Sequence, residues 1–181
     1  MNYIWAENGM VCKMLETKDL VLDKARMSDW KDMYCNVWSR LECARYMAWR
    51  VAENESEAME RMKKTIEYQK NHDTYLIYEK ACMRAIGFAG VEKIAPDVYA
   101  ETGICLGADY FGRGYGSQVV LRLIEYCKGQ GAREFGYSAR EGNVAANRLA
   151  VSLGFITVGI EEKTDRRNGL KYKLVKYRLE L

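Results

Sequence analysis

Three glycines, Gly112, Gly114 and Gly116, lie within five residues in the stretch YFGRGYGSQVV. Aliphatic residues at helical spacing follow at once, so a helix is expected to begin here. A glycine inside a regular element costs about 0.5–1 kcal/mol relative to alanine, which indicates that a ligand approaches the backbone. Unhindered N–H groups from Arg113 to Ser117 could converge on an anion, and the helix N-terminus adds partial positive charge. With the forked cationic donor of Arg113, the pattern is typical of a pyrophosphate cradle.

Two common phosphate-binding motifs do not account for these glycines. A P-loop requires a lysine and a hydroxyl residue directly after its last glycine, whereas the first lysine after this turn is Lys128. The spacing G-x-G-x-G also differs from the G-x-G-x-x-G of dinucleotide-binding folds, and it does not follow a first βα unit. A tight strand-to-helix turn without a ligand stays open as the alternative.

The composition is that of one globular domain. The chain has 181 residues, of which 49% are apolar, and its 28 basic and 25 acidic side chains leave a net charge of only +3. This balance does not favour nucleic acid, and no apolar stretch approaches the ~20 residues of a membrane span. Six cysteines without a C-x-x-C pair, and the single His72, predict free thiols and no metal site. We therefore expect an arm at 1–14 and a single cytoplasmic domain over 15–181.

Hydrophobic periodicity predicts an ordered series of strands and helices. Strands are expected at 18–25, 74–80, 83–94, 101–110, 133–140, 155–162 and 170–181. Helices are expected after a Ser28 cap, at 40–49, at 54–70, from the glycine turn to Gly129, and at 143–154. Asn54, with Glu57 three residues later, reads as a capping box. Meandering strands before a βαβαβ half predict an α/β (α+β) fold with a mixed, mostly antiparallel sheet of six to seven strands.

The stretch FGRGYGS resembles the acetyl-coenzyme A signature of the GCN5-related N-acetyltransferase (GNAT) superfamily, Q/R-x-x-G-x-G/A. Gly114 and Gly116 take the two glycine positions. Phe111 stands where Gln or Arg is usual, a departure typical of the RimJ/RimL-like branch. Residues 101–117 and 143–159 resemble two longer motifs of that branch, and the resemblance spans about residues 14–181.

The resemblance implies that acetyl-CoA lies in a gap between two splayed parallel strands, here 101–109 and 133–139. A bulge in the first strand, which Gly107 would suit, would aim backbone N–H groups at the thioester oxygen. The contacts to the coenzyme implied in this way come from Ile104, Cys105, Leu106, Gly107, Phe111, Gly112, Arg113, Gly114, Tyr115, Gly116, Ser117, Asn143 and Asn147.

The implied reaction is direct attack of an amine on the thioester, which needs a general base. Glu101 is the first candidate for this base and Glu92 the second, because both lie in strands that border the acceptor side. Asp165 and Glu162, near the last hairpin, are further candidates.

The leaving thiolate needs a proton, and the usual donors of the superfamily are missing. The tyrosine of many members is replaced by Ala150, and the serine usual in the branch is replaced by Ala146. Ser138, at the end of its strand, is the catalytic substitute that we consider, with Ser152 as a weaker one.

The amine acceptor stays open among a protein N-terminus, an amino acid and another small amine. Four residues of the first helical region either belong to the core or line the acceptor pocket: Trp38, Tyr46, Met47 and Trp49. A coenzyme A-binding sensor or complex subunit without transferase activity remains an alternative, because Ala146 and Ala150 carry no acid. A nucleotide-dependent oxidoreductase is a third reading. No nucleic acid or membrane partner is expected, and the protein would be a monomer or a homodimer.

Overall fold

The computed structural model describes residues 14–181, and the rest of the expected N-terminal arm, with Ile4 and Trp5, lies outside the described residues. One sheet in the order β1-β2-β3-β4-β5-β6-β8-β7 runs through this part of the chain. Its strands are β1 (Leu15–Glu16), β2 (Leu20–Asp23), β3 (Asp73–Glu79), β4 (Arg84–Ala95), β5 (Val98–Leu106), β6 (Glu134–Arg140), β7 (Ile156–Thr164) and β8 (Lys171–Glu180). Only β5 and β6 pair in parallel, which confirms the mixed, mostly antiparallel sheet.

The eighth strand is the one difference from the expected six to seven. β1 is two residues long and pairs Leu15 with Leu22 and Glu16 with Val21 at the edge of the sheet. Two residues are too few for an alternating pattern, so the sequence carries no period that would reveal this strand.

The helices follow one another in the predicted order, but the first helical segment differs from the prediction in its structure. They are α1 (Trp30–Met33), α2 (Leu41–Ala44), α3 (Glu55–Gln69), α4 (Tyr115–Gly129) and α5 (Val144–Ser152). A 3-10 turn (Met27–Asp29) precedes α1, and a π-helical turn (Tyr34–Trp38) extends it. The prediction that Ser28 caps this helix is wrong, because Ser28 lies inside the 3-10 turn, where Asp29 Oδ2 accepts from the Arg26 N–H at 2.7 Å.

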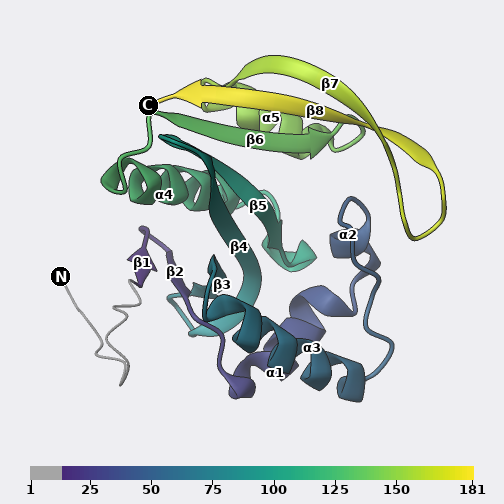
Figure 1. Ribbon diagram of the computed structural model, residues 1–181. Helices are drawn as coiled ribbons and strands as arrows, with labels where there is room; N and C mark the ends of the chain where they lie inside the picture. The colour runs from purple at the N-terminus through teal and green to yellow at the C-terminus, as the bar shows by residue number, and fades with distance from the viewer. Residues whose placement is uncertain (1–13) are drawn as a thin grey trace.

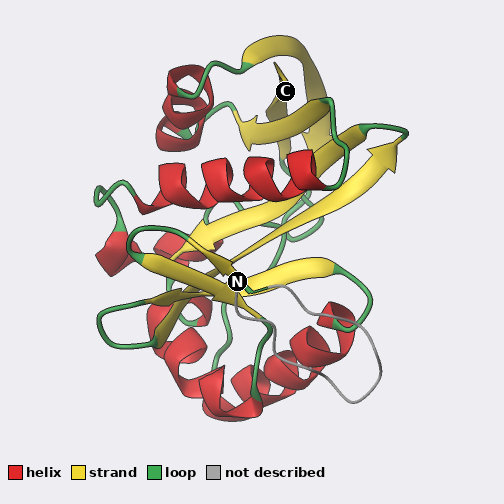
Figure 2. Ribbon diagram, turned by 90° about the vertical axis from the view of Figure 1, so that its left-hand side faces the viewer, coloured by secondary structure: helices red, strands yellow, loops and turns green. Residues whose placement is uncertain are grey.

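The two faces of the sheet carry two separate cores. In β3, Tyr75 and Ile77 pack with α4, while Leu76 and Tyr78 pack with α1 and α3. This assignment follows from the two-residue period of a strand. Figures 1 and 2 show α4 on one side of the sheet and α1 and α3 on the other. Because α4 packs on the sheet, the glycine turn at its N-terminus is held close to the end of β5.

The hairpin between β4 and β5 is tighter than expected. Ala95 pairs with Val98 across Pro96 and Asp97, and Asp97 adopts a φ of +59°. β5 therefore begins three residues before the predicted start at Glu101. Those three extra residues, 98–100, make the pairing with β6.

Candidate active site

The sheet opens between β5 and β6. These strands pair only from Val98–Glu134 to Ala100–Gly136, although β5 continues to Leu106 and β6 to Arg140. Beyond residue 100, β5 stays paired with β4, while β6 stays paired with β8. The expected gap between splayed parallel strands is therefore confirmed.

A bulge lies at the start of this gap. Glu101 pairs with Val91 and Gly103 pairs with Gly90, so Thr102 is the extra residue of β5. Gly103 has a φ of +133°, which only glycine adopts readily. The bulge expected at Gly107 is thus wrongly placed by about four residues.

The amide of Gly107 is already used, because it donates to the Ile86 carbonyl at 2.7 Å. Peptide groups of an antiparallel strand point alternately to its two sides. Cys105 therefore also points its N–H towards β4, and the N–H groups of Ile104 and Leu106 point into the gap. Of the four residues expected to contact a thioester, these two have amides suitably directed.

Glu101 sits where the pairing of β5 with β6 stops. Its Oε1 accepts from the Ser138 N–H at 3.2 Å and from Ser138 Oγ at 3.0 Å, so a carboxylate takes the place of the next ladder bond. Burial raises the pKa of Glu101, the hydrogen bonds from Ser138 and the Gly103 amide oppose this shift, and the negative charge of Glu92 adds to it. A carboxylate with a raised pKa in a gap is a suitable proton acceptor. Glu92 itself is exposed on β4.

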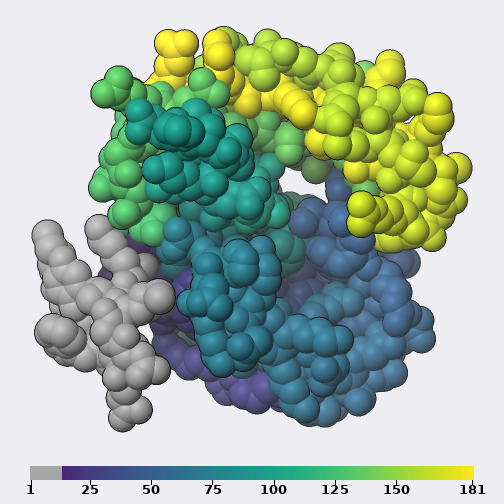
Figure 3. All heavy atoms as spheres, in the orientation of Figure 1, coloured from purple at the N-terminus to yellow at the C-terminus, as the bar shows by residue number. Residues whose placement is uncertain are grey.

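A cavity of about 500 Å³ extends from the gap to the glycine turn. It is lined by Ile104, Cys105 and Leu106 of β5, by Tyr110, Phe111, Gly112, Gly114, Tyr115 and Gly116 of the turn, by Asn143, Val144, Ala145, Ala146 and Leu149 around α5, by Glu42, Cys43, Tyr46 and Met47 around α2, and by Tyr137 and Gly142. The space-filling view shows the molecule hollowed between the blue segment that contains α2 and the green and yellow strands (Figure 3).

The glycines of the turn have different roles. Gly112 and Gly114 have φ of +74° and +75°, and a Cβ built on either would meet nothing within 4 Å. Both line the cavity, so a side chain there would occupy the space in front of the α4 N-terminus. A Cβ on Gly116 would instead lie 3.3 Å from Leu149 of α5. Gly116 therefore allows α4 and α5 to approach, while the first two glycines leave room for an anion.

The comparison with protein families agrees with this geometry. The family described as acetyltransferase (GNAT) domain matches residues 19–156. This chain belongs to the GNAT acetyltransferase family. A curated relative, the uncharacterised N-acetyltransferase p20 of Bacillus licheniformis, is 30% identical over 115 residues. That match covers 62% of this chain and 64% of the relative, so the chain spans less than two thirds of the relative's length.

Solved structures share the fold of this GNAT domain. The ribosomal alpha-N-protein acetyltransferase RimL, described in complex with coenzyme A, aligns with a TM-score of 0.77 at 20% identity over 93% of this chain and 98% of its own. The microcin self-immunity acetyltransferase MccE, described in complex with acetyl-CoA and AMP, aligns with a TM-score of 0.77 at 20% identity over 91% and 93% of the two chains.

Arg113 of the GNAT domain does not line the cavity. Its guanidinium bonds to Glu79 at 3.3 Å and to the Asp109 carbonyl at 3.0 Å, and it lies 5.0 Å from the Tyr110 ring centre. Ser117, in the first turn of α4, is also outside the lining. Of the groups expected to hold an anion, the backbone amides of the turn therefore remain at the cavity, and a phosphate contact of Arg113 stays a prediction.

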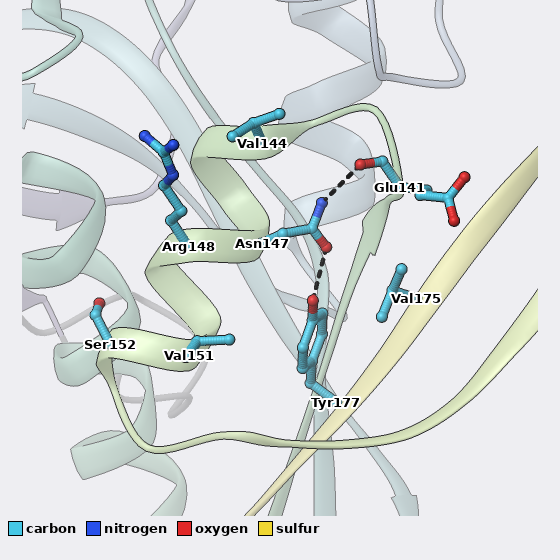
Figure 4. Close-up of a pocket in the computed structure, with 8 residues that line it drawn as sticks. All are labelled: Glu141, Val144, Asn147, Arg148, Val151, Ser152, Val175 and Tyr177. Carbon is cyan, nitrogen blue, oxygen red and sulfur yellow. Dashed lines mark hydrogen bonds between the residues drawn. The ribbon is translucent and has the colours of Figure 1, made fainter.

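Asn143 and Asn147, both expected at the coenzyme, line two different cavities. Asn143 lines the cavity and caps α5 by accepting from the Ala146 N–H at 3.2 Å. Asn147 lines a different, apolar cavity on the other side of α5, where its amide donates to the Glu141 carbonyl at 3.2 Å and accepts from Tyr177 Oη at 2.8 Å (Figure 4). Asn147 thus fixes the loop that leads into α5 and does not border the cavity at the glycine turn.

The segment around α2 closes the cavity from the side of the first helices. Tyr46 Oη donates to the Gly142 carbonyl at 2.8 Å, and Cys43 Sγ donates to the Leu106 carbonyl at 3.4 Å. Trp38 is buried in the core below, and Arg61 packs between the rings of Trp38 and Trp49. Of the four residues left open, Tyr46 and Met47 line the cavity. Cys43 was not foreseen, because nothing local in the sequence marks a contact between α2 and β5.

Asp165 holds the final hairpin to the same segment. Its carboxylate bonds to Arg140 at 2.9 Å and to Arg167 at 2.7 Å, and these pairs hold its pKa well below the usual range. Arg167 in turn donates to the carbonyls of Ala44 and Trp49. A carboxylate with two guanidinium partners is a poor base, which removes Asp165 as a candidate.

Asp165→Asn is expected to lower the melting temperature at pH 7 by several degrees, because two partly buried guanidinium groups lose their partner. The depressed folded-state pKa stabilises the protein above about pH 4, the usual range for aspartate, and this contribution is lost as the pH falls further. Thermal melting between pH 3 and pH 7 measures both effects. Glu162→Gln, which removes an exposed ion pair with Lys171 on the same hairpin, is the control and should change little. Equal melting of the two variants would contradict this role of Asp165.

Proposed function

We propose that this protein is an acetyl-CoA-dependent N-acetyltransferase that transfers an acetyl group to a primary amine by direct attack on the thioester. The observation that carries the proposal is the continuous space from the open glycine turn before α4 to the gap between β5 and β6. A ligand with a pyrophosphate at one end and a thioester at the other fits this arrangement.

The pyrophosphate would lie at the N-terminus of α4. This helix has fifteen residues, so its first amides carry the partial positive charge of a full helix dipole. Gly112 and Gly114 leave the approach to those amides free. Phe111 and Tyr115 would flank the coenzyme from the same turn, and Asn143 would do so from the start of α5.

The thioester would lie at the open part of β5, where acetyl-CoA supplies the acetyl group in activated form. The N–H groups of Ile104 and Leu106, which point into the gap, are placed to stabilise negative charge on its oxygen. Glu101, at the closed end of the gap, would accept the proton of the attacking amine. The bulge at Thr102 and Gly103 separates these two functions along one strand.

The finer assignments are also proposals. RimL is described as a ribosomal alpha-N-protein acetyltransferase, which supports a peptide N-terminus as the acceptor, and an amino acid or another small amine is the alternative. We propose that residues 15–181 act as one cytoplasmic domain of the RimJ/RimL-like branch, as a monomer or a homodimer. None of the helices in residues 14–181 is long and apolar enough to cross a membrane.

The test is release of free thiol from acetyl-CoA in the presence of an amine panel, with peptides that begin with different residues, free amino acids and aminoglycosides. Amine-dependent thiol release, with the acetylated amine identified by mass spectrometry, is the expected result. Tight binding of acetyl-CoA without turnover on any amine would favour the alternative, a coenzyme A sensor or complex subunit. Ala146 and Ala150 support this alternative, because they carry no acid. Binding of NAD in place of coenzyme A would overturn both.

A further inference from the structure

The reaction proposed above needs a proton for the leaving thiolate, and no side chain of α5 is placed to give it. Ser152, the weaker substitute considered from the sequence, donates its hydroxyl to the Leu149 carbonyl at 2.8 Å and lines the other cavity. Ala150 is 1% exposed in the core, and Ala146 lines the cavity with a methyl group. Either an acid of another element lies at this place, or water is the donor. The side chains that line the cavity decide between these possibilities.

Most hydroxyl and thiol groups near the cavity are already directed elsewhere. Tyr46 donates to the Gly142 carbonyl, and Tyr115 donates to Glu79 at 2.7 Å. The thiols of Cys43 and Cys105 face the carbonyls of Leu106 and Cys43. Ser138, the substitute expected from the sequence, donates its hydroxyl to Glu101 at 3.0 Å, so its proton is directed at the proposed base.

Two tyrosines of the lining remain, and they lie at opposite ends. Tyr110 belongs to the glycine-turn end, where its ring carries the Arg113 guanidinium. Tyr137 follows Gly136, the last residue of β6 that pairs with β5, so it stands at the point where the gap opens. It is therefore level with Glu101, and it lines the same cavity as Ile104, beside which the thioester would lie. Among the described residues, no hydrogen-bond partner of the Tyr137 hydroxyl is found, and the residue keeps 8% of its surface exposed.

The ring of Tyr137 is directed towards α5. Alternate residues of β6, Phe135, Tyr137 and Ala139, are buried in the core that contains Ala150. The ring packs against Phe155 and Tyr177, with centroids 5.6 Å and 6.3 Å away. Tyr137 therefore lines the cavity from the neighbouring strand, while the residues with which α5 lines it, Val144, Ala145, Ala146 and Leu149, carry no proton donor.

The surroundings keep the Tyr137 hydroxyl protonated. Burial raises its pKa above the usual value for tyrosine, and the negative charge of Glu101 raises it further. Tyr137 therefore stays protonated at neutral pH, the form that can give a proton. The two groups thus have opposite proton tasks on either side of the gap.

We propose that Tyr137 is the catalytic acid of this transferase and donates its hydroxyl proton to the sulfur of coenzyme A as the carbon–sulfur bond breaks. The inference rests on the proposed function. The amine nitrogen forms the new bond to the acetyl carbon and gives one proton to Glu101. The electron pair of the broken bond goes to sulfur, which takes the Tyr137 proton. Water then returns a proton to Tyr137 and removes one from Glu101, so the reaction is balanced.

The test is Tyr137→Phe, which keeps the ring and removes only the hydroxyl. We expect kcat to fall about 100-fold, the lower end of general acid catalysis, because a thiolate is a fair leaving group. The Kd for coenzyme A, measured by calorimetry, should stay within about threefold. Tyr177→Phe is the matched control, since this tyrosine packs on Tyr137 but bonds to Asn147 outside the cavity. It should keep kcat within about threefold.

A second variant distinguishes chemistry from packing. Ala146→Ser places a hydroxyl on α5 beside the cavity, and in the Tyr137→Phe background it should recover at least about tenfold in kcat. A merely structural role of Tyr137 would not be rescued in this way.

The outcomes separate the two proposals. If the wild-type enzyme turns over and Tyr137→Phe keeps its kcat, or loses coenzyme A affinity and kcat in the same proportion, the acid role is overturned while the transferase function stands. If the wild type binds coenzyme A and transfers to no amine, the proposed function fails and the acid role fails with it.

Discussion

Gly114→Val is expected to weaken binding of acetyl-CoA by about 100-fold or more while the protein still folds. Gly114 is the residue before α4, its φ is +75°, and a Cβ there would extend into the open cavity. A valine would place two further methyl groups in front of the amides that form the cradle. Since binding of the pyrophosphate depends on close approach to those amides, the loss should appear in affinity. Calorimetric titration with coenzyme A measures it.

The matched control is Gly131→Val. Gly131 follows α4 with a φ of +86°, and a Cβ there also meets nothing within 4 Å, but this residue is far along the chain from the turn and does not line the cavity. Both variants force a β-branched residue into a left-handed conformation and should lose similar stability, about 1–2 kcal/mol. Only Gly114→Val should lose affinity. Similar coenzyme A affinities for the two variants would show that the turn is not the cradle.

Glu101→Gln is expected to lower kcat by about 10²–10⁴-fold, the range for removal of a general base. Glutamine keeps an acceptor for the Ser138 hydrogen bonds, so the gap should keep its shape. The melting temperature at pH 7 should rise. A carboxylate whose pKa is raised by burial favours the folded state only below its unfolded pKa, and it loses that contribution as the pH rises through the folded pKa. Replacing it by a neutral amide removes the cost of the buried charge.

The pH dependence identifies Glu101 more sharply than the rate alone. In the wild type, kcat/KM should rise with pH as Glu101 ionises, at a higher pH than for an ordinary glutamate. Ser138→Ala removes a hydrogen bond that lowers this pKa, so the rise should move to still higher pH. Glu92→Gln, on the exposed part of β4, is the control and should keep kcat within about threefold. A tenfold or smaller loss in Glu101→Gln, with the pH profile unchanged, would assign the base to a water chain or another residue.

Much of the site was predictable because its signals are local. At the glycine turn, Gly112 and Gly114 adopt a positive φ and α4 begins directly after them, and both features depend on only a few neighbouring residues. The cap of α5 by Asn143 and that of α3 by Asn54 are equally local, since each side chain bonds to an amide three residues on. The gap between β5 and β6 followed from the resemblance of the residues around it to a known family.

Strand register and the partners of individual side chains could not be predicted from the sequence. Gly103 and Gly107 both lie in the strand expected at 101–110, and the sequence does not tell which one is next to the bulge. The pairing of Glu101 with Val91 and of Gly103 with Gly90 decides the bulge. In the same way, Arg113 was expected at a phosphate, and only the position of β3 shows that Glu79 lies within its reach.

The sequence by itself determined the order of the elements, the mixed sheet and a glycine turn that leaves an anion access to a helix N-terminus. It also determined that the usual proton donors of the family are missing, because that conclusion needs only the identities of Ala146 and Ala150. The tertiary structure alone decided which groups meet around the gap and the cavity: Glu101 with Ser138, Tyr46 with the loop before α5, and Arg113 with Glu79. These contacts join residues far apart in the chain, and strand register and helix packing set them, so no local pattern of residues could specify them.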